Sequence, residues 1–413
     1  MDLREKLERM DPHSGVRTSA EVSMPSGKRL SDYLPGGEVS TPCGPCFSVR
    51  WEYDLDHYHG SFQLQNLLTL SGKEVQTLTF DQSLSGFDFK RAAFIDVETS
   101  SLSGGVGTFA FLIGVAYLEN DSLCVEQYLM RDFIEEPNLL HLLSERLRSF
   151  SYLVTYNGKC FDTSILSARY LLNRLKSPLD DLPHLDLLFP ARRLWRRRFK
   201  DCSLTHLELA LLDFQRVEDI PSHLIPHIYF DYLRDNDPEM LVPVFNHNRD
   251  DLISLVALTA TACELVREDR PHFVTHPVDL LSLGRHFYNA GQYQKTASIL
   301  EETPEGQLSA EFRREYHFLL GDCCKKLSLW DKAEEIWGAY LESGQGFCLH
   351  FHLELAKLYE HRIKDLSRAR QMTLMALSGF ENLTSDLGQR FVRLQREKLL
   401  HRLNRIERKQ LRN

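Results

Sequence analysis

The sequence predicts an α/β domain followed by an all-α helical-repeat domain. Two patterns lead to this prediction. From residue 92 to residue 175, apolar runs of strand length alternate with stretches of helical spacing. After about residue 277 only helical spacing remains, and it is weakly self-similar. A chain of 413 residues is also too long for one ordinary core, so we expect more than one domain.

The α/β region begins with three apolar runs of strand length. Glu119-Asn120-Asp121 is a tight-turn sequence between the second and the third, so we expect an antiparallel meander. The expected order is strand Ala92–Val97, strand Phe109–Tyr117, strand Leu123–Met130, helix Pro137–Phe150, strand Leu153–Tyr156 and helix Thr163–Leu175. Helices then dominate from about Leu204 to Val266.

The flanking segments carry weaker signals. Residues 1–50 are rich in Ser, Pro, Gly and charge, so we expect a poorly ordered arm. Phe62–Leu70 and Glu74–Phe80 alternate weakly and are expected to be peripheral strands. The α/β domain is therefore expected to span residues 51–270, with its core at 88–265.

The region 277–413 is expected to form tetratricopeptide-like repeats. Ala297, Ala333 and Ala369 recur at a spacing of 36, each shortly after a loop-like junction. Small residues at such positions let paired helices approach closely. A plain helical bundle is the alternative. The Arg-rich tail from Gln395 is either a solvated cap or a surface that binds a partner.

The composition excludes several classes of protein. Hydrophobic residues make up 43% and charged residues 26%, as in folded soluble proteins. The sequence has no long apolar stretch and no secretory signal, so we expect no membrane contact and a cytoplasmic location. A net charge of -9 argues against a protein that coats nucleic acid, although a local basic track remains compatible with it. Nine cysteines fit reduced thiols, and the role of Cys43 and Cys46 is open.

Two carboxylates share one face of the first strand. Side chains alternate along a strand, so Asp96 and Glu98 point to one side while Ile95 and Val97 point to the other. Neighbouring carboxylates are costly to bury unless a cation neutralises them, and oxygen ligands suit Mg²⁺ or Mn²⁺. The pair alone is weak support, because Asp-x-Glu occurs by chance at many strand ends.

Two further acidic positions lie at expected helix starts. Asp162 follows an apolar strand and a Gly-containing turn, and taken alone it is better explained as an N-cap. His247 and Asp251 are four residues apart, so they share a helix face and place a proton acceptor beside a carboxylate. A solvated helix start is again the alternative.

The three segments together resemble the DEDD exonucleases of the ribonuclease H-like superfamily, in the variant with a histidine in the third motif. They occur in the order Asp-x-Glu, Asn-x-x-x-Phe-Asp and His-x-x-x-Asp, in strand, strand-to-helix and helix contexts. Three strands, a helix, a strand and a helix is also the order of that fold. More closely, the sequence resembles bacterial proteins of the YprB type, which join such a domain to tetratricopeptide-like helices. The resemblance covers about residues 85–265.

The resemblance implies a metal-dependent nuclease that degrades single-stranded DNA or RNA from the 3′ end. Two divalent cations, Mg²⁺ or Mn²⁺, would activate the attacking water and stabilise the leaving 3′ oxygen. His247 would take the proton from that water. The implied metal ligands, which are also catalytic, are Asp96, Glu98, Asp162 and Asp251.

Basic and polar residues near the motifs are candidate contacts to nucleic acid. Six cations crowd into residues 192–200 with Trp195 and Phe199 among them, as suits phosphate binding and base stacking. A solvated helix face with Trp195 packed inward is the alternative. The candidate contacts are Thr99, Asn157, Lys159, Arg192, Arg193 and Arg196.

Two other functions remain open. One is a non-catalytic adaptor, which the complete set of acids argues against. The other is an endonuclease selective for structured junctions, which the histidine of the third motif disfavours. We also expect the helical repeats to bind a protein partner or the substrate.

Overall fold

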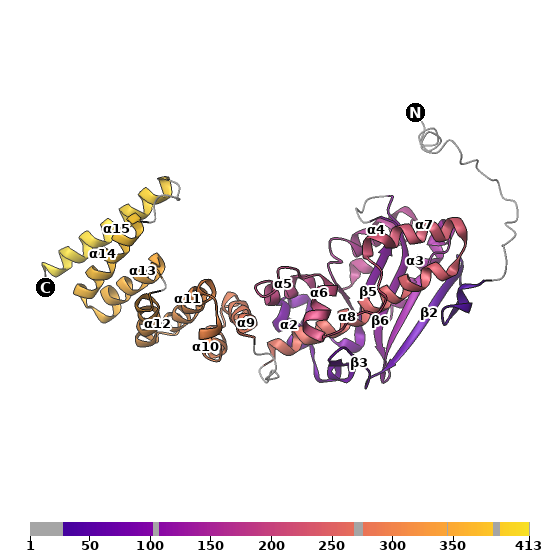
Figure 1. Ribbon diagram of the computed structural model, residues 1–413, viewed down its shortest axis with the longest axis horizontal. Coiled ribbons are helices and arrows are strands. Elements are labelled where there is room, and N and C mark those ends of the chain that lie inside the picture. Colours follow the sequence, from indigo (N-terminus) through magenta and orange to yellow (C-terminus); the bar gives the residue numbers. More distant parts are fainter. Residues whose placement is uncertain (1–27, 102–106, 268–275, 345, 383–388, 413) are drawn as a thin grey trace, which may run out of the picture.

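The computed structural model describes residues 28–101, 107–267, 276–344, 346–382 and 389–412. A mixed sheet flanked by helices forms one end of the molecule, and only helices follow it (Figure 1). This arrangement confirms the predicted fold class. Within the described residues, no helix combines the length and the apolar character that crossing a membrane requires.

The main sheet has seven strands in the order β1-β2-β7-β6-β5-β8-β9. Neighbours from β1 through to β5 pair antiparallel, whereas β8 and β9 run parallel to β5. A separate hairpin pairs β3 with β4. The strands are β1 Gly36–Thr41, β2 Gly44–Asp54, β3 Tyr58–His59, β4 Phe62–Gln63, β5 Ala92–Thr99, β6 Ala110–Glu119, β7 Ser122–Leu129, β8 Tyr152–Thr155 and β9 His184–Asp186.

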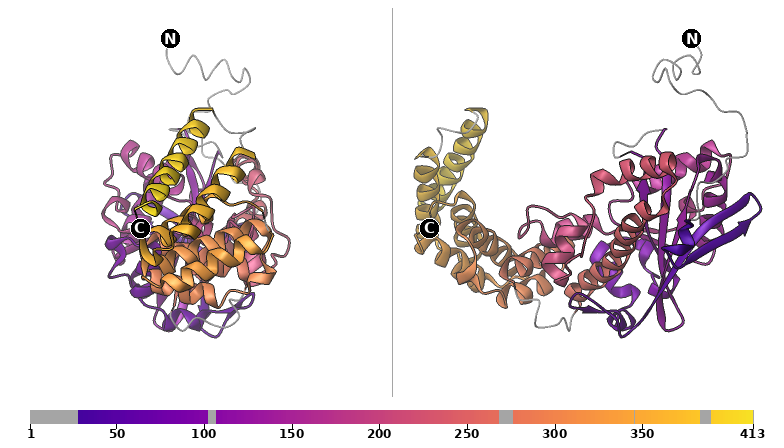
Figure 2. Two further views of the ribbon diagram at one scale, coloured as in Figure 1. Left: turned by 90° about the vertical axis from the view of Figure 1, so that its left-hand side faces the viewer. Right: turned by 45° about the vertical axis from the view of Figure 1, so that its right-hand side comes forward.

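Helices cover both faces of this sheet (Figure 2). Helix α8 lies across β5, β6 and β7 and shares a buried core with α2, α5 and α6. Helices α3, α4 and α7 share the core on the opposite face. The helices of this region are α2 Gly72–Thr79, α3 Glu136–Leu147, α4 Asp162–Leu172, α5 Leu188–Trp195, α6 Leu204–Leu212, α7 Ile225–Asp235 and α8 Val242–Val266.

Three segments predicted within the first 90 residues differ from the structure. Residues 36–50 form β1, a turn and the first part of β2, and β2 pairs with β7 from Phe47 to Asp54, so the sheet extends into the predicted arm. Residues 1–27 of that arm lie outside the described residues. The predicted strand Glu74–Phe80 is helix α2, because Ser71 and Glu74 form a capping box at its start. In Phe62–Leu70, strand β4 ends at Gln63 and a 3₁₀ helix follows.

The second region consists of helices stacked in pairs. The three alanines at a spacing of 36 lie in α10, α12 and α14, the second helix of successive pairs, and all three are buried. A Cβ on Gly321 in α11 would overlap the ring of Trp337 in α12, so this close approach requires glycine. The helices are α9 Pro277–Asn289, α10 Tyr293–Glu301, α11 Ala310–Lys326, α12 Trp330–Glu342, α13 Leu349–Leu358, α14 Leu366–Asn382 and α15 Gln389–Gln410. Their tetratricopeptide-like character stays a prediction.

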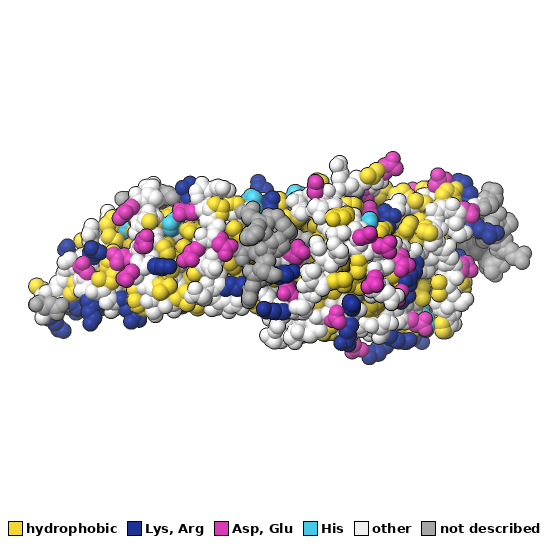
Figure 3. Space-filling view, turned by 90° about the horizontal axis from the view of Figure 1, so that it is seen from below, with side chains coloured by type: hydrophobic (Ala, Val, Ile, Leu, Met, Phe, Trp, Pro, Cys, Tyr) yellow, Lys and Arg dark blue, Asp and Glu magenta, His cyan; other side chains and the backbone are white. Residues whose placement is uncertain are grey.

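The Arg-rich helix α15 closes the far end of the helical region. Its Arg402, Arg405 and Lys409 all donate to Glu360, whose side chain is fully buried between them. Other cations of this helix face solvent, and Lys and Arg side chains gather at this end of the molecule in the space-filling view (Figure 3). One face of the tail is therefore structural.

The two regions share a packed junction. Arg198 pairs with Asp279 at 2.8 Å, and Arg197 pairs with Glu315 at 3.0 Å. Phe80 at the end of α2 stacks on His286 of α9, with ring centroids 4.4 Å apart. Helix α9 begins at Pro277, where the second domain is expected to start, yet its apolar face belongs to the core beneath α8. The division at residues 270–277 therefore stays a proposal.

Candidate active site

Strand β5 carries Asp96 and Glu98 to the sheet face that α8 covers. In β6, Gly114 lies opposite Asp96 and Leu112 lies opposite Glu98. Phe94 on the same face packs into the core beneath α8, whereas odd-numbered neighbours such as Ile95 pack into the core on the other face. The two carboxylates therefore share a face, as the alternation along the strand requires.

Helix α8 approaches the sheet closely at Asp96. A Cβ on Gly114 would lie 2.5 Å from Leu252 and closer still to the amide oxygen of Asn248, so only glycine fits there. Asn248 donates to the Asp96 carboxylate at 2.8 Å and in turn accepts from Gln127 at 2.8 Å. Both amides are fully buried, and this chain of hydrogen bonds fixes the orientation of Asp96. No signal in the sequence marks Asn248, although it adjoins His247.

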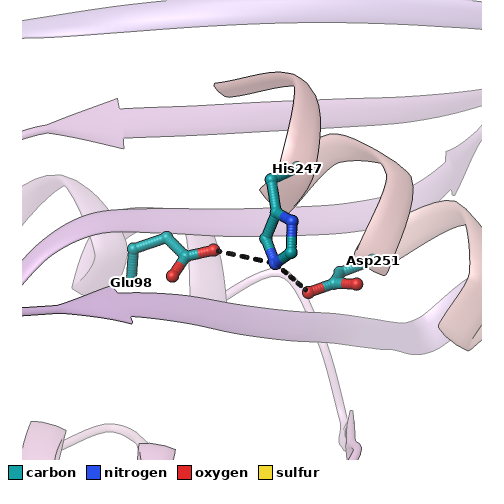
Figure 4. Close-up of side chains that lie close together, drawn as sticks. All are labelled: Glu98, His247 and Asp251. Carbon is teal, nitrogen blue, oxygen red and sulfur yellow. Dashed lines mark ion pairs between the residues drawn. The ribbon is translucent and has the colours of Figure 1, made fainter. Parts of the chain in front are cut away.

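Glu98, His247 and Asp251 form a compact cluster between β5 and α8 (Figure 4). His247 Nε2 lies 3.5 Å from Asp251 Oδ2 and 4.0 Å from Glu98 Oε1. One ligand atom from each of the three residues lies within 4.8 Å of the others. The imidazole is buried, with 4% of its side chain exposed, and the Ser222 hydroxyl lies 3.4 Å from its Nε2.

Asp162 begins helix α4 after a tightly held turn. The turn residue Asn157 has a left-handed backbone with φ of 64°. Asp186 at the end of β9 accepts from the backbone amide of Asn157 at 2.8 Å and from that of Lys159 at 3.0 Å. Asp186 thus has a structural role, since it fixes the turn that leads to Asp162.

Burial makes the negative charge of these carboxylates unfavourable unless a cation balances it. It raises the pKa of Asp96 and of Glu98 well above the usual range, and the neighbouring carboxylates raise both further. For Asp162, burial followed by the charges of Asp186 and Asp251 raises the pKa to about 7. Mutually repelling, buried carboxylate oxygens are the donor set that hard divalent cations prefer. Mg²⁺ or Mn²⁺ therefore fits these residues.

Three residues at the site carry no recognisable motif. Arg216 and Asp219 lie between α6 and α7, and Glu208 lies within α6. Arg216 donates to both Glu208 oxygens and to Asp251, while Asp219 pairs with His247 at 2.7 Å. No residue spacing reveals this arrangement, because a loop brings Arg216 and Asp219 to α8.

The basic segment at residues 192–200 splits into two parts. Arg192, Arg196 and Lys200 line a pocket of about 660 Å³ that also borders Asn157. Arg193 lies apart from it and donates to the backbone oxygen of Leu78 at 2.9 Å. Arg197 and Arg198 form the junction ion pairs, and Trp195 is buried in the core as the alternative expected.

The other candidate contacts lie close to the motifs. Thr99 follows Glu98 on β5, and its hydroxyl donates to the backbone oxygen of Ser101 at 3.0 Å. Lys159 is exposed on the turn before Asp162. Cys46 lies in β2 and Cys43 lies in the turn that precedes this strand. Burial raises the pKa of Cys46 to about 12, whereas a redox nucleophile requires a lowered pKa.

Comparisons with known proteins agree with this geometry. Residues 93–263 match the model of a family described as the RNase H superfamily. The α/β region has a ribonuclease H-like fold. The matched segment contains all five residues of the predicted site, and the superfamily indicates a nuclease-type function that acts on nucleic acid.

The similarity to one curated protein extends beyond that segment. The chain is 29% identical to the uncharacterized protein YprB of Bacillus subtilis (strain 168) over 417 residues, which cover 96% of this chain and 99% of that protein. The helical region is therefore part of the similarity.

Proposed function

We propose that the chain is a metal-dependent nuclease that hydrolyses phosphodiester bonds of single-stranded nucleic acid from the 3′ end. The observation that carries this proposal is the meeting of Glu98 and Asp251 with the buried imidazole of His247, within the electrostatic reach of Asp96 and Asp162. Buried acids with raised pKa values beside a proton acceptor are typical of catalytic sites. The direction of degradation rests on the resemblance of the three motifs to those of the DEDD exonucleases.

In this proposal, Asp96, Glu98, Asp162 and Asp251 hold two divalent cations, Mg²⁺ or Mn²⁺, whose charge activates water and stabilises the leaving oxygen. Asn248 keeps the Asp96 carboxylate turned into the site through the 2.8 Å hydrogen bond. His247 presents Nε2 to the cluster and accepts the proton that the attacking water releases.

The proposed path of the strand runs beside the turn that leads to Asp162. Asn157 lies both in this turn and in the wall of the basic pocket, so a strand bound at the carboxylates can place a neighbouring phosphate near Arg192, Arg196 and Lys200. Thr99 and Lys159 flank the metal ligands as further contacts. Arg193 is withdrawn from this set because its guanidinium bonds to α2.

The helical region is proposed to be a tetratricopeptide-like domain that binds a protein partner or extends the substrate track. Its stacked helix pairs and buried alanines support this assignment. The wide similarity to YprB supports a role that needs both regions. A cytoplasmic location is proposed from the same sequence features as before.

The test uses single-stranded DNA and RNA labelled at either end, with Mn²⁺ or Mg²⁺, beside the Asp96→Ala variant. Stepwise shortening from the 3′ end by the parent, absent from the variant, is the expected result and reveals the sugar preference. Cleavage of closed circular strands would show that the protein is an endonuclease and not an exonuclease. Binding of nucleic acid without cleavage, by folded protein in either metal, would favour the adaptor.

A further inference from the structure

We propose that Arg216 and Asp219 are positioning residues that set the orientation of Asp251 and His247 for the reaction. Both lie on the segment between α6 and α7, outside the three motifs. The inference deepens the proposed nuclease function and rests on it for the catalytic readout. Its structural basis is a set of contacts around the faces of Asp251 and His247 that are turned away from the cluster.

Asp219 determines which ring nitrogen of His247 carries the proton. The Asp219 carboxylate lies 2.7 Å from Nδ1, whereas the Arg216 guanidinium lies farther from the same nitrogen, at 3.3 Å. A carboxylate can only accept a hydrogen bond, so the shorter contact makes Nδ1 the donor. In the neutral ring Nε2 is then the acceptor, and it faces Asp251 and Glu98. A proton acceptor is thereby presented to the site where water would be activated.

Arg216 holds Asp251 through the carboxylate oxygen that does not face His247 Nε2. Its guanidinium bonds to Oδ1 of Asp251, which leaves Oδ2 turned toward His247 and the proposed metal position. Glu208 anchors the same guanidinium through a pair of hydrogen bonds at 2.6 and 2.9 Å. Ser254 of α8 donates to Glu208 in turn, so the anchor is tied to the helix that carries Asp251.

The planar fork of arginine suits this position. Arg216 is almost fully buried, with 6% of its side chain exposed, and it meets Glu208 on one edge and Asp251 on another. Oδ2 of Asp219 lies 3.5 Å from Nη1, the third nitrogen of the same guanidinium. A lysine ammonium cannot form the paired bonds to Glu208 while reaching Asp251. The cation also lowers the pKa of Glu98 against the rise that burial causes.

The main test is Asp219→Asn, because Asp219 is 28% exposed and its replacement leaves the core intact. An amide can donate to Nδ1 and favour the ring form in which Nε2 carries the proton. We expect kcat to fall on the order of 10²- to 10⁴-fold with KM within about twofold. Asp219→Glu restores the carboxylate and is expected to recover part of kcat. Asp235→Asn, which removes a surface partner of Arg234, is the matched control with parental kcat.

Two readouts separate this inference from the nuclease proposal. The ¹⁵N shifts of the His247 ring, assigned through His247→Gln, should report an Nδ1 proton in the parent and its loss in Asp219→Asn. Calorimetric titration with Mn²⁺ should show about 10- to 100-fold weaker binding in Arg216→Lys and parental binding in Asp219→Asn. Both results can be obtained even if the parent cuts no substrate, which would refute the nuclease proposal alone.

Several outcomes would overturn the inference. Parental kcat in Asp219→Asn, or an Nε2 proton on His247 in the parent, would remove the role of Asp219. Parental Mn²⁺ affinity in a folded Arg216→Lys variant would remove that of Arg216. An equal loss of kcat and thermal stability in both variants and in Asp235→Asn would show a structural effect only.

Discussion

The carboxylate of Asp162 should destabilise the metal-free protein at neutral pH. Asp162 begins α4 in a buried environment, and burial with the charges of Asp186 and Asp251 raises its pKa from the ordinary 3.8 to about 7. In the unfolded chain the same group loses its proton near pH 4. Between these values the folded state binds more protons than the unfolded state, so the stability of the fold falls as pH rises.

The size of the effect follows from the shift. A rise of about three pKa units corresponds to an upper limit of about 4 kcal/mol, lost progressively from pH 4 to pH 7 and constant above that. Asp162→Asn removes the ionisation and keeps the shape of the side chain. We therefore expect the variant, in EDTA at pH 8, to be more stable than the parent by about 2 kcal/mol or more.

Thermal unfolding of both proteins from pH 4.5 to 8.5 measures this difference. About 2 kcal/mol corresponds to a rise in Tm of about 4–8 °C for a domain of this size. The gain should shrink to about a quarter of its pH 8 size at pH 4.5, and Mn²⁺ should stabilise the parent more than the variant. The exposed pair Lys176–Asp181 supplies the control Asp181→Asn, which should not show the pH 8 gain. A variant less stable than the parent at pH 8 would refute the reasoning.

Three further outcomes are expected. Gly114→Ala should push α8 from the sheet at Asp96. The rate of hydrolysis should then fall by more than tenfold, measured by kinetics, and overpacking should lower the free energy of unfolding by about 1–3 kcal/mol, measured by urea unfolding. Arg192→Ala with Lys200→Ala should raise KM, leave kcat near the parental value and weaken the salt dependence of strand binding, read by fluorescence anisotropy. Gly321→Ala should lower the Tm of the helical region through its clash with the ring on α12, without changing kcat.

The sheet core could be predicted because its elements are both periodic and buried. In β5, apolar residues alternate with the acids, and the one-residue alternation assigns each side chain to a face. The same logic placed β6, β7 and β8 within a few residues of their observed bounds. Buried strands tolerate few residue types, so their sequence pattern is easy to recognise.

The first strands of the chain have a weaker sequence pattern. β1 is an edge strand whose side chains are mostly exposed, so polar residues and glycine are tolerated there and resemble a loop composition. In α2 the capping box of Ser71 and Glu74 was the stronger signal, and it outweighs the weak alternation of the following residues.

The site shows the same division. Asp96, Glu98, His247 and Asp251 could be proposed because regular elements fix their spacing. Arg216 could not, since a loop carries it to Asp251 and nothing in the local sequence records that distant contact. The basic segment is uniform in composition, yet its cations point in two directions. Because Trp195 packs into the core, Arg192 faces the pocket whereas Arg197 pairs with Glu315 at the junction.

The most direct test of the account is a Mn²⁺ titration of the metal-free parent and of Asp96→Asn, with hydrolysis of a 3′-labelled single strand followed in the same samples. We expect the parent to bind Mn²⁺ and to gain activity as the metal saturates, whereas the folded variant should lose both. A parent that binds no Mn²⁺ and cuts no strand, or a variant that retains full activity, would contradict the claim that these carboxylates form a nuclease centre.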